Sequence, residues 1–188
     1  MSRSSNEPIH LEKNLEMNVA TIKKILGNSA DLIIRKSSIG MIENQFAMIY
    51  LKGLVNEDQV NNNILRMLEL NKKDITKNLF DALYDEMIAL TEIKKSPKLD
   101  SIILALLNGD TVVLLNDEDQ ALLLGTSGGE FRSIEEPQSE SVIRGSRSGF
   151  VESLKLNLAL LRRELKNPNL RIDLMEIGPY SNQKMAIC

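Results

Sequence analysis

The residues best suited to bind a charged group surround one loop in the last third of the chain. Arg144 and Arg147 lie in the run Arg-Gly-Ser-Arg-Ser-Gly, just before an amphipathic segment that favours a helix. A helix N-terminus has free N–H groups and a partial positive charge. A helix capped by Ser148 or Gly149 would therefore form an anion-binding site with Arg144, Arg147 and Gly149. The spacing differs from the G-x-x-x-x-G-K-[ST] of nucleotide-binding loops, so no nucleotide site is predicted.

Acidic side chains near this loop offer the arginines a different role. Glu136 and Glu140 precede the loop and Glu152 follows it, and a guanidinium can hold a carboxylate with two hydrogen bonds as it can a phosphate. Ion pairs between segments are common and anion sites are few, so we favour contacts between two lobes or two subunits. The residues expected to make these contacts are Glu136, Glu140, Arg144, Arg147, Glu152, Asn157 and Arg162.

Two of these residues belong to the helical segment itself. Asn157 follows Phe150 by about two helical turns and lies among leucines, so we expect it to bond a backbone group of a neighbouring strand rather than a ligand. Arg162 stands with Arg163 and Lys166 at the end of the helix, where positive charge complements the helix dipole. A contact with another subunit is the more specific alternative for this basic end.

Residues for catalysis or metal binding are scarce. His10 is the only histidine and Cys188 the only cysteine, so neither a Ser-His-Asp or Cys-His site nor a histidine-based metal site is supported, and no internal disulfide can form. The carboxylates of residues 117–119 lack the spacing of a calcium loop and are typical of a solvated turn. We therefore expect no enzymatic activity, no metal and no cofactor.

Composition excludes further classes of partner. The chain has a formal net charge of −3, 4% aromatic residues and no tryptophan, so it lacks both the positive charge and the stacking surface for nucleic acid. Met1 to Pro8 lacks the layout of a signal peptide, and the longest apolar run, 102–107, is far shorter than the ~20 residues that span a bilayer. Lys184 to Cys188 resembles a strand cut short, so we expect the chain to be an excised fragment of a longer protein.

Hydrophobic periodicity and breaker residues predict intermixed helices and strands. Residues 11–26 repeat apolar side chains at helical spacing, and Gly27-Asn28 would end that helix. The remaining expected elements are strands at 31–36 and 46–51, helices from Asn56 and over 76–87, a helix that contains Pro97 in its first turn and ends at Asn108-Gly109, and a hairpin of strands 111–115 and 121–125.

We predict an α/β fold of two small mixed lobes, the second incomplete in this chain. The expected division is a disordered tail at 1–10, a first lobe with the N-terminal helix at 11–129, a linker at 130–143 and the truncated start of a second lobe at 144–188. The second lobe would contain a helix over 149–165 and, after the breaker Pro168, two strands. No internal repeat is evident in the sequence.

Residues 136–162 also follow the pattern E-P-x-x-E-x-x-x-R-G-x-x-x-G-F-x-E-x-x-x-x-N-x-x-L-[IL]-R. On this pattern the chain resembles the A-subunit family of bacterial spore germinant receptors, the GerA family. The resemblance extends over roughly 99–187 and covers the first hundred residues only in outline. Ser146 stands where the family usually has proline, and Glu164 stands where a second basic residue is usual.

The resemblance implies the soluble N-terminal domain of a membrane protein of nutrient-triggered spore germination. It implies a location on the core side of the spore inner membrane, attachment through a missing C-terminal part, and partners among B-type, C-type and further A subunits. We expect a non-catalytic role in assembly and signal relay. The alternative is a binding module that closes its inter-lobe cleft on an anion or an amino-acid-like molecule, with Arg144 and Arg147 as holders.

Overall fold

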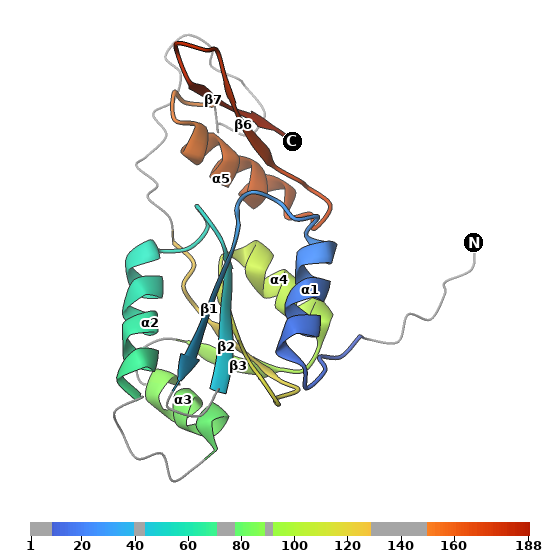
Figure 1. Ribbon diagram of the computed structural model, residues 1–188, viewed down its shortest axis with the longest axis vertical. Coiled ribbons are helices and arrows are strands. Elements are labelled where there is room, and N and C mark those ends of the chain that lie inside the picture. The colour runs from blue at the N-terminus through green and yellow to red at the C-terminus, as the bar shows by residue number, and fades with distance from the viewer. Residues whose placement is uncertain (1–8, 40–43, 71–77, 89–91, 129–149) are drawn as a thin grey trace, which may run out of the picture.

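The computed structural model describes residues 9–39, 44–70, 78–88, 92–128 and 150–188 (Figure 1). These residues form five helices and seven strands, so the predicted mixed α/β class is confirmed. In chain order the elements are α1 (Leu15–Ile25), β1 (Leu32–Ile39), β2 (Asn44–Leu51), α2 (Glu57–Leu70), α3 (Leu79–Ile88), β3 (Ile93–Ser96), α4 (Leu99–Asn108), β4 (Thr111–Leu115), β5 (Ala121–Leu124), α5 (Leu154–Leu165), β6 (Asp173–Ile177) and β7 (Gln183–Ile187).

Five strands form one antiparallel sheet, here called the main sheet, in the order β1-β2-β4-β5-β3. Alternate residues of β2 point to opposite faces, because the side-chain period of a strand is two. Ala47, Ile49 and Leu51 belong to the core that contains α1 and α4. Phe46, Met48 and Tyr50 belong to the core that contains α2 and α3. The main sheet is therefore covered by helices on both faces, as Figure 1 shows.

Local signals in the sequence account for most helix ends. Asn14 caps α1 by accepting a hydrogen bond from the Met17 backbone N–H, and the Asn56 side chain accepts bonds from Asp58 and Gln59 at the start of α2. Helix α4 ends at Gly109, whose φ of 92° few other residues adopt. The predicted start of α2 at Asn56 and the predicted end of α4 at Asn108-Gly109 are confirmed, whereas α1 begins at Leu15 and not at Leu11, where the helical spacing starts.

Two further predicted helix starts are wrong. Pro97 precedes Lys98, the N-cap of α4, and is therefore not in the first turn of the helix. The backbone N–H of Leu11 donates to the Pro97 carbonyl, which keeps this residue in the segment before the helix. Helix α5 begins at Leu154 rather than Gly149, with Ser153 as its N-cap. The side chain of Asn157 binds both backbone groups of Val151 and holds that residue outside the helix.

The C-terminal elements form a smaller body at one end of the main sheet. Here α5, β6 and β7 are called the C-terminal unit; β6 and β7 pair antiparallel from Asp173↔Ile187 to Ile177↔Gln183. Figure 1 shows the unit above the end of the main sheet, with α5 next to it and the hairpin beyond. Leu174, Ile177 and Ile187 are each about half exposed, so the hairpin is much less covered than the main sheet.

Some predicted segments lie outside the described residues, including the linker at 130–143. Ile9 and His10, assigned from the sequence to the tail, pair with the start of α4: Leu99 donates a backbone hydrogen bond to Ile9, and His10 forms a bridge with Lys98. No helix within the described ranges is both long enough and apolar enough to cross a membrane.

Candidate functional site

The most unusual side chain in the described structure is a completely buried arginine. Arg162 lies in the last turn of α5 with 0% of its surface exposed, between the C-terminal unit and the main sheet. Its Nε donates to Oδ2 of Asp31 at 2.7 Å, and its Nη2 donates to Oδ1 of the same carboxylate at 2.9 Å. This two-bond grip is the geometry in which guanidinium and carboxylate interact most strongly.

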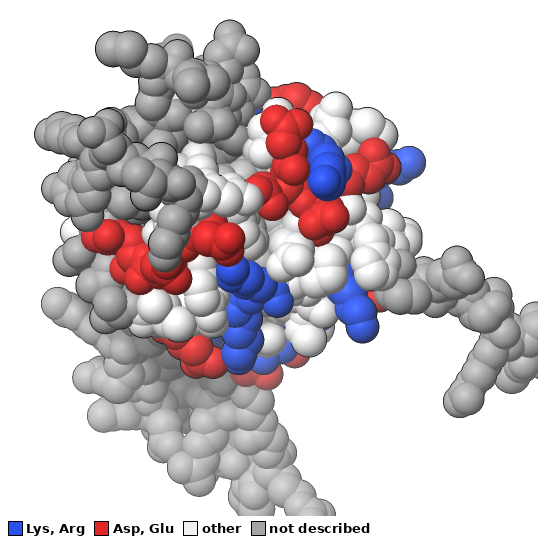
Figure 2. All heavy atoms as spheres, turned by 90° about the horizontal axis from the view of Figure 1, so that it is seen from below, with Lys and Arg blue, Asp and Glu red and all other residues white. Residues whose placement is uncertain are grey.

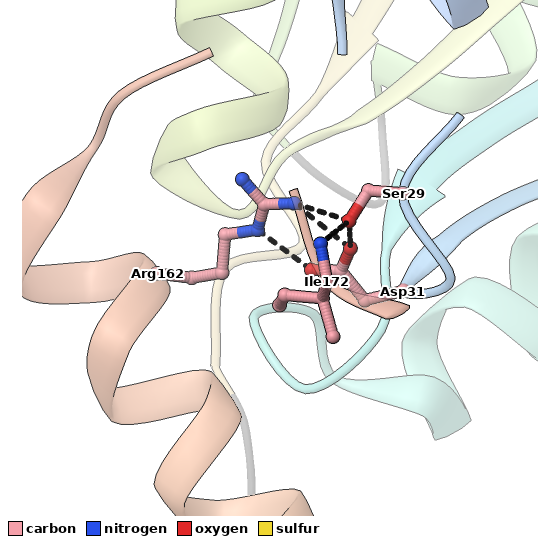
Figure 3. Close-up of polar contacts among 4 residues, drawn as sticks. All are labelled: Ser29, Asp31, Arg162 and Ile172. Carbon is pink, nitrogen blue, oxygen red and sulfur yellow. Dashed lines mark hydrogen bonds and ion pairs between the residues drawn. The ribbon is translucent and has the colours of Figure 1, made fainter. Parts of the chain in front are cut away.

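Ser29 and the segment before β6 extend the contact (Figure 3). The Nη2 of Arg162 also donates to Oγ of Ser29 at 2.7 Å, and Ser29 in turn donates to Oδ1 of Asp31 at 2.6 Å. The backbone N–H of Ile172 donates to the same Oγ at 2.9 Å, and the N–H of Ala30 donates to the Ile172 carbonyl at 2.8 Å. We call Ser29, Asp31, Arg162 and Ile172 the junction.

The turn after α1 presents the two acceptors of the junction. Gly27 and Asn28 both have positive φ, 67° and 55°, which reverses the chain at the end of the helix. The Arg171 side chain lies so close over Gly27 that a Cβ there would clash with it. The turn places Ser29 and Asp31, both buried, beneath α5.

The buried ion pair of the junction specifies one arrangement of α5 more than it adds to the free energy of folding. Burying two opposite charges costs desolvation energy that their attraction only partly returns, whereas leaving one of them unpaired is strongly unfavourable. Within the described residues, Nη1 of Arg162 is buried and has no hydrogen-bond partner, which adds to the cost. Arginine and aspartate therefore define where α5 docks more than they strengthen the fold.

Small residues and further polar pairs surround the junction. A Cβ on Gly53 would stand 3.1 Å from the Cβ of Ala159, so α5 approaches the chain closely there. Lys155 pairs with Glu57 at 3.4 Å, and Lys166 donates to the side chain of Asn108 at 3.0 Å. A groove of about 290 Å³ lies beside these contacts, lined by Gly53, Val55, Asn56, Glu57, Asp58, Gly128, Lys155, Leu156 and Ala159.

The predicted site residues have separate outcomes. Glu136, Glu140, Arg144, Arg147 and Gly149 lie outside the described residues. Arg162 is in the junction. Glu152 is exposed next to the N-cap of α5 and forms no ion pair with another described residue. These positions remain proposals for a contact or binding role.

The predicted partner of Asn157 is wrong in detail. Its Oδ1 accepts from the Val151 N–H at 2.8 Å and its Nδ2 donates to the Val151 carbonyl at 2.7 Å. The partner is thus a backbone residue just before its own helix, not a neighbouring strand. The predicted anion site also required a helix that starts at Ser148 or Gly149. Helix α5 starts at Leu154, so this part of the prediction is wrong.

Sequence reasoning missed Ser29 and Asp31. The signal that could have found Asp31 is an acidic residue directly before the apolar run Leu32-Ile33-Ile34 that opens β1, where burial is expected and a charged side chain needs a partner. Nothing in the sequence points from there to Arg162, which lies far along the chain.

Charged groups at the end of the molecule opposite α5 lie on the surface. Figure 2 views the end of the molecule opposite α5 and shows acidic and basic side chains interspersed there. In the turn at 117–119 the Glu118 carboxylate accepts from the Asn78 side chain and the backbone N–H of Asp117 donates to the Lys13 carbonyl, while the side chains of Asp117 and Asp119 are exposed. Within the described ranges, no group of three or more His, Cys, Asp or Glu side chains is placed to hold a metal.

The fold is that of a known class of receptor domain. The crystal structure of the N-terminal domain of the A subunit of the Bacillus megaterium spore germinant receptor GerK3 matches this chain with a TM-score of 0.74. The match covers 96% of this chain and 66% of that chain, at 22% sequence identity. At this identity the likeness establishes the fold.

The family follows from the sequence comparisons. The family model described as Bacillus/Clostridium GerA spore germination protein matches residues 20–188, and the chain therefore belongs to the GerA family. It is 31% identical to spore germination protein KA of Bacillus subtilis (strain 168) over 186 residues, and 31% identical to spore germination protein GerLA of Bacillus cereus over 179 residues. These alignments cover 98% and 95% of this chain but 34% and 36% of the relatives, so the chain spans about a third of their length.

Proposed function

We propose that this chain is the non-catalytic N-terminal domain of a germinant receptor A subunit and serves assembly and signal relay in nutrient-triggered spore germination. Family membership and the fold of a receptor A-subunit domain support this assignment. In the proposed setting, the full-length protein resides in the spore inner membrane and this domain projects on the core side. Its partners would be B-type and C-type subunits and further A subunits.

The single observation that carries the relay is the buried pair of Arg162 and Asp31. It joins two residues that are 131 positions apart in the chain, and its two charges are costly to bury and costly to separate. Such an ion pair is either formed or broken, with little in between. A movement of α5 caused by another subunit would therefore shift the balance between the two states. The two arginines of the loop and Glu152 are proposed to extend this contact to a neighbouring lobe or subunit.

The test uses the intact receptor in spores. Arg162→Gln should slow nutrient-triggered germination while the amount of receptor in the membrane stays normal, and Arg144→Ala and Glu152→Gln should slow it to a lesser degree. Lys24→Gln, an exposed lysine of α1, is the matched control and should behave as wild type. Normal germination by Arg162→Gln at a normal receptor level would contradict the proposal.

The alternative is a small-molecule binding domain, and the groove beside Lys155 favours it. The groove lies between α5 and the segment that leads from β2 into α2, and it contains the cation of Lys155 paired with Glu57 at the start of α2. Calorimetry with candidate amino acids and anions should give saturable heat if this function holds. That heat would vanish in Lys155→Ala or Arg144→Ala. Absence of binding at millimolar ligand would leave assembly and relay as the sole proposal.

A further inference from the structure

The helix that carries Arg162 has a counterpart near the start of the chain. When Leu154 is aligned with Leu15, five of the fourteen positions from 15 to 28 are identical, although Glu16 aligns with Lys155 and Ile25 with Glu164. The identical pairs are Leu15/Leu154, Asn18/Asn157, Ala20/Ala159, Leu26/Leu165 and Asn28/Asn167. The basic pair Lys23-Lys24 aligns with Arg162-Arg163.

The correspondence extends to hydrogen bonds. The side chain of Asn18 accepts from the backbone N–H of Glu12 at 3.0 Å and donates to its carbonyl at 2.6 Å. Asn157 makes the same two bonds with Val151, the aligned residue. Each helix is then followed by an antiparallel hairpin, β1–β2 after α1 and β6–β7 after α5. A helix followed by an antiparallel hairpin therefore occurs twice in the described residues, although no internal repeat is evident in the sequence.

The two copies differ in which helix face is buried. In α1 the apolar stripe packs into the core, since Leu15, Val19, Ile22 and Leu26 are at most 5% exposed. The aligned leucines of α5 are only half buried, and Leu165 is 55% exposed. Instead α5 buries a flank: Ala159 is 3% exposed and Arg162 is fully buried, whereas the aligned Ala20 and Lys23 are exposed on α1.

We propose that the C-terminal unit is a second copy of the α1–β1–β2 unit that docks on the first as a separate body, through the flank of Ala159 and Arg162, and that Arg162 controls docking. In α1 the corresponding flank, with Ala20 and Lys23, is exposed and takes no part in the core. Its contacts are mostly polar, as in interfaces between domains that move. The inference deepens the proposed relay by naming its movable contact, and it can be tested without any germination assay.

Hydrogen exchange of the full chain, followed residue by residue by NMR, provides the test. The N–H groups of Ala30 and Ile172 report docking, because each bonds across the interface. The N–H groups of the β6–β7 ladder report the internal fold of the C-terminal unit. In Arg162→Gln the exchange of Ala30 and Ile172 should become about tenfold faster or more, since hydrogen bonds to a buried charge are lost. The β6–β7 ladder should stay unchanged.

The repeat supplies the matched control, Lys23→Gln, which alters the aligned but exposed position and should change none of these rates. Asp31→Asn removes the charge from the other side of the interface and should accelerate the same two amides. Equal acceleration of the β6–β7 ladder, or loss of protection in β2 and β4, would overturn the proposal, because a separate body undocks without unfolding. Unchanged exchange at Ala30 and Ile172 would also overturn it. Germination by the same variants is a separate result that bears only on the proposed function.

Discussion

Arg162 and Asp31 meet through two hydrogen bonds, of 2.7 and 2.9 Å, although one closes the last turn of α5 and the other directly precedes β1. Neither side chain is accessible to water to any extent that would screen the pair. The pair therefore defines a single docked arrangement of the C-terminal unit on the main sheet, and the predictions below start from it.

Ala159→Leu should weaken docking without touching a charge. The Cβ of Ala159 already stands 3.1 Å from the position of a Cβ on Gly53, so a larger side chain forces α5 away, at a cost of about 1–3 kcal/mol in the free energy of unfolding. The aligned variant Ala20→Leu lies on an exposed face and should leave stability nearly unchanged. Urea unfolding of both variants checks this, and equal losses would show that the flank of α5 is not a docking face.

Asn157→Ala should destabilise the start of α5. It leaves the N–H and carbonyl of Val151 without their side-chain partner, at a cost of about 1–3 kcal/mol for partly buried groups. Asn157→Asp keeps the acceptor for the N–H but loses the donor to the carbonyl, so its loss should lie between those of wild type and alanine. Thermal unfolding measures the order; a harmless alanine variant would contradict this account of the helix start.

Gly109→Ala should be among the costlier glycine replacements. Gly109 has φ of 92°, and a Cβ would come within 2.7 Å of the Leu54 carbonyl oxygen. Strain of this kind costs about 1–3 kcal/mol, before the steric clash is added. Gly128→Ala shares a positive φ, but its nearest neighbour is a side-chain atom at 3.8 Å. Chemical unfolding should therefore show the smaller loss at Gly128.

Asp110 should make the folded state slightly more stable at acidic pH than at neutral pH. Burial raises the pKa of Asp110 above its ordinary value, with the Lys94 charge acting in the opposite direction. In the pH range between the unfolded-state pKa and the raised folded-state pKa, the folded state binds more protons, so stability falls as pH rises through that range. Asp110→Asn should therefore raise the melting temperature at neutral pH and change it much less near about pH 4. A variant with the same effect at both pH values would exclude this cause.

The sequence predicts the main sheet and its helices well, because each element carries a local signal. The apolar run of β2, the cap Asn56 and Gly109 each act within a few residues of the feature they specify. The same reasoning misplaced the start of α5, because Gly149 and Ser148 are plausible caps by type. The bonds that hold Val151 outside the helix come from Asn157, a side chain about two helical turns after these two residues.

The junction could not be found from local patterns. Its members come from a turn after α1, the end of α5 and the residue before β6, and only tertiary packing brings them together. The basic residues at the end of α5 suggested a helix-dipole effect, which fits an exposed arginine as well as a buried one. What distinguishes Arg162 from Arg163 is which side of the helix meets the main sheet, and this depends on the docking of the whole C-terminal unit.

A double-mutant cycle on Arg162 and Asp31, measured in the full chain as the free energy of docking from the hydrogen exchange of the Ala30 and Ile172 N–H groups, tests the central claim most directly. Arg162→Met and Asp31→Leu should each cost about 3–5 kcal/mol, since each leaves the partner charge buried and unpaired. The double variant should cost far less than the two losses combined, with a coupling energy of about 2 kcal/mol or more. Losses that simply add, with a coupling energy near zero, would show that the two residues do not act as a pair.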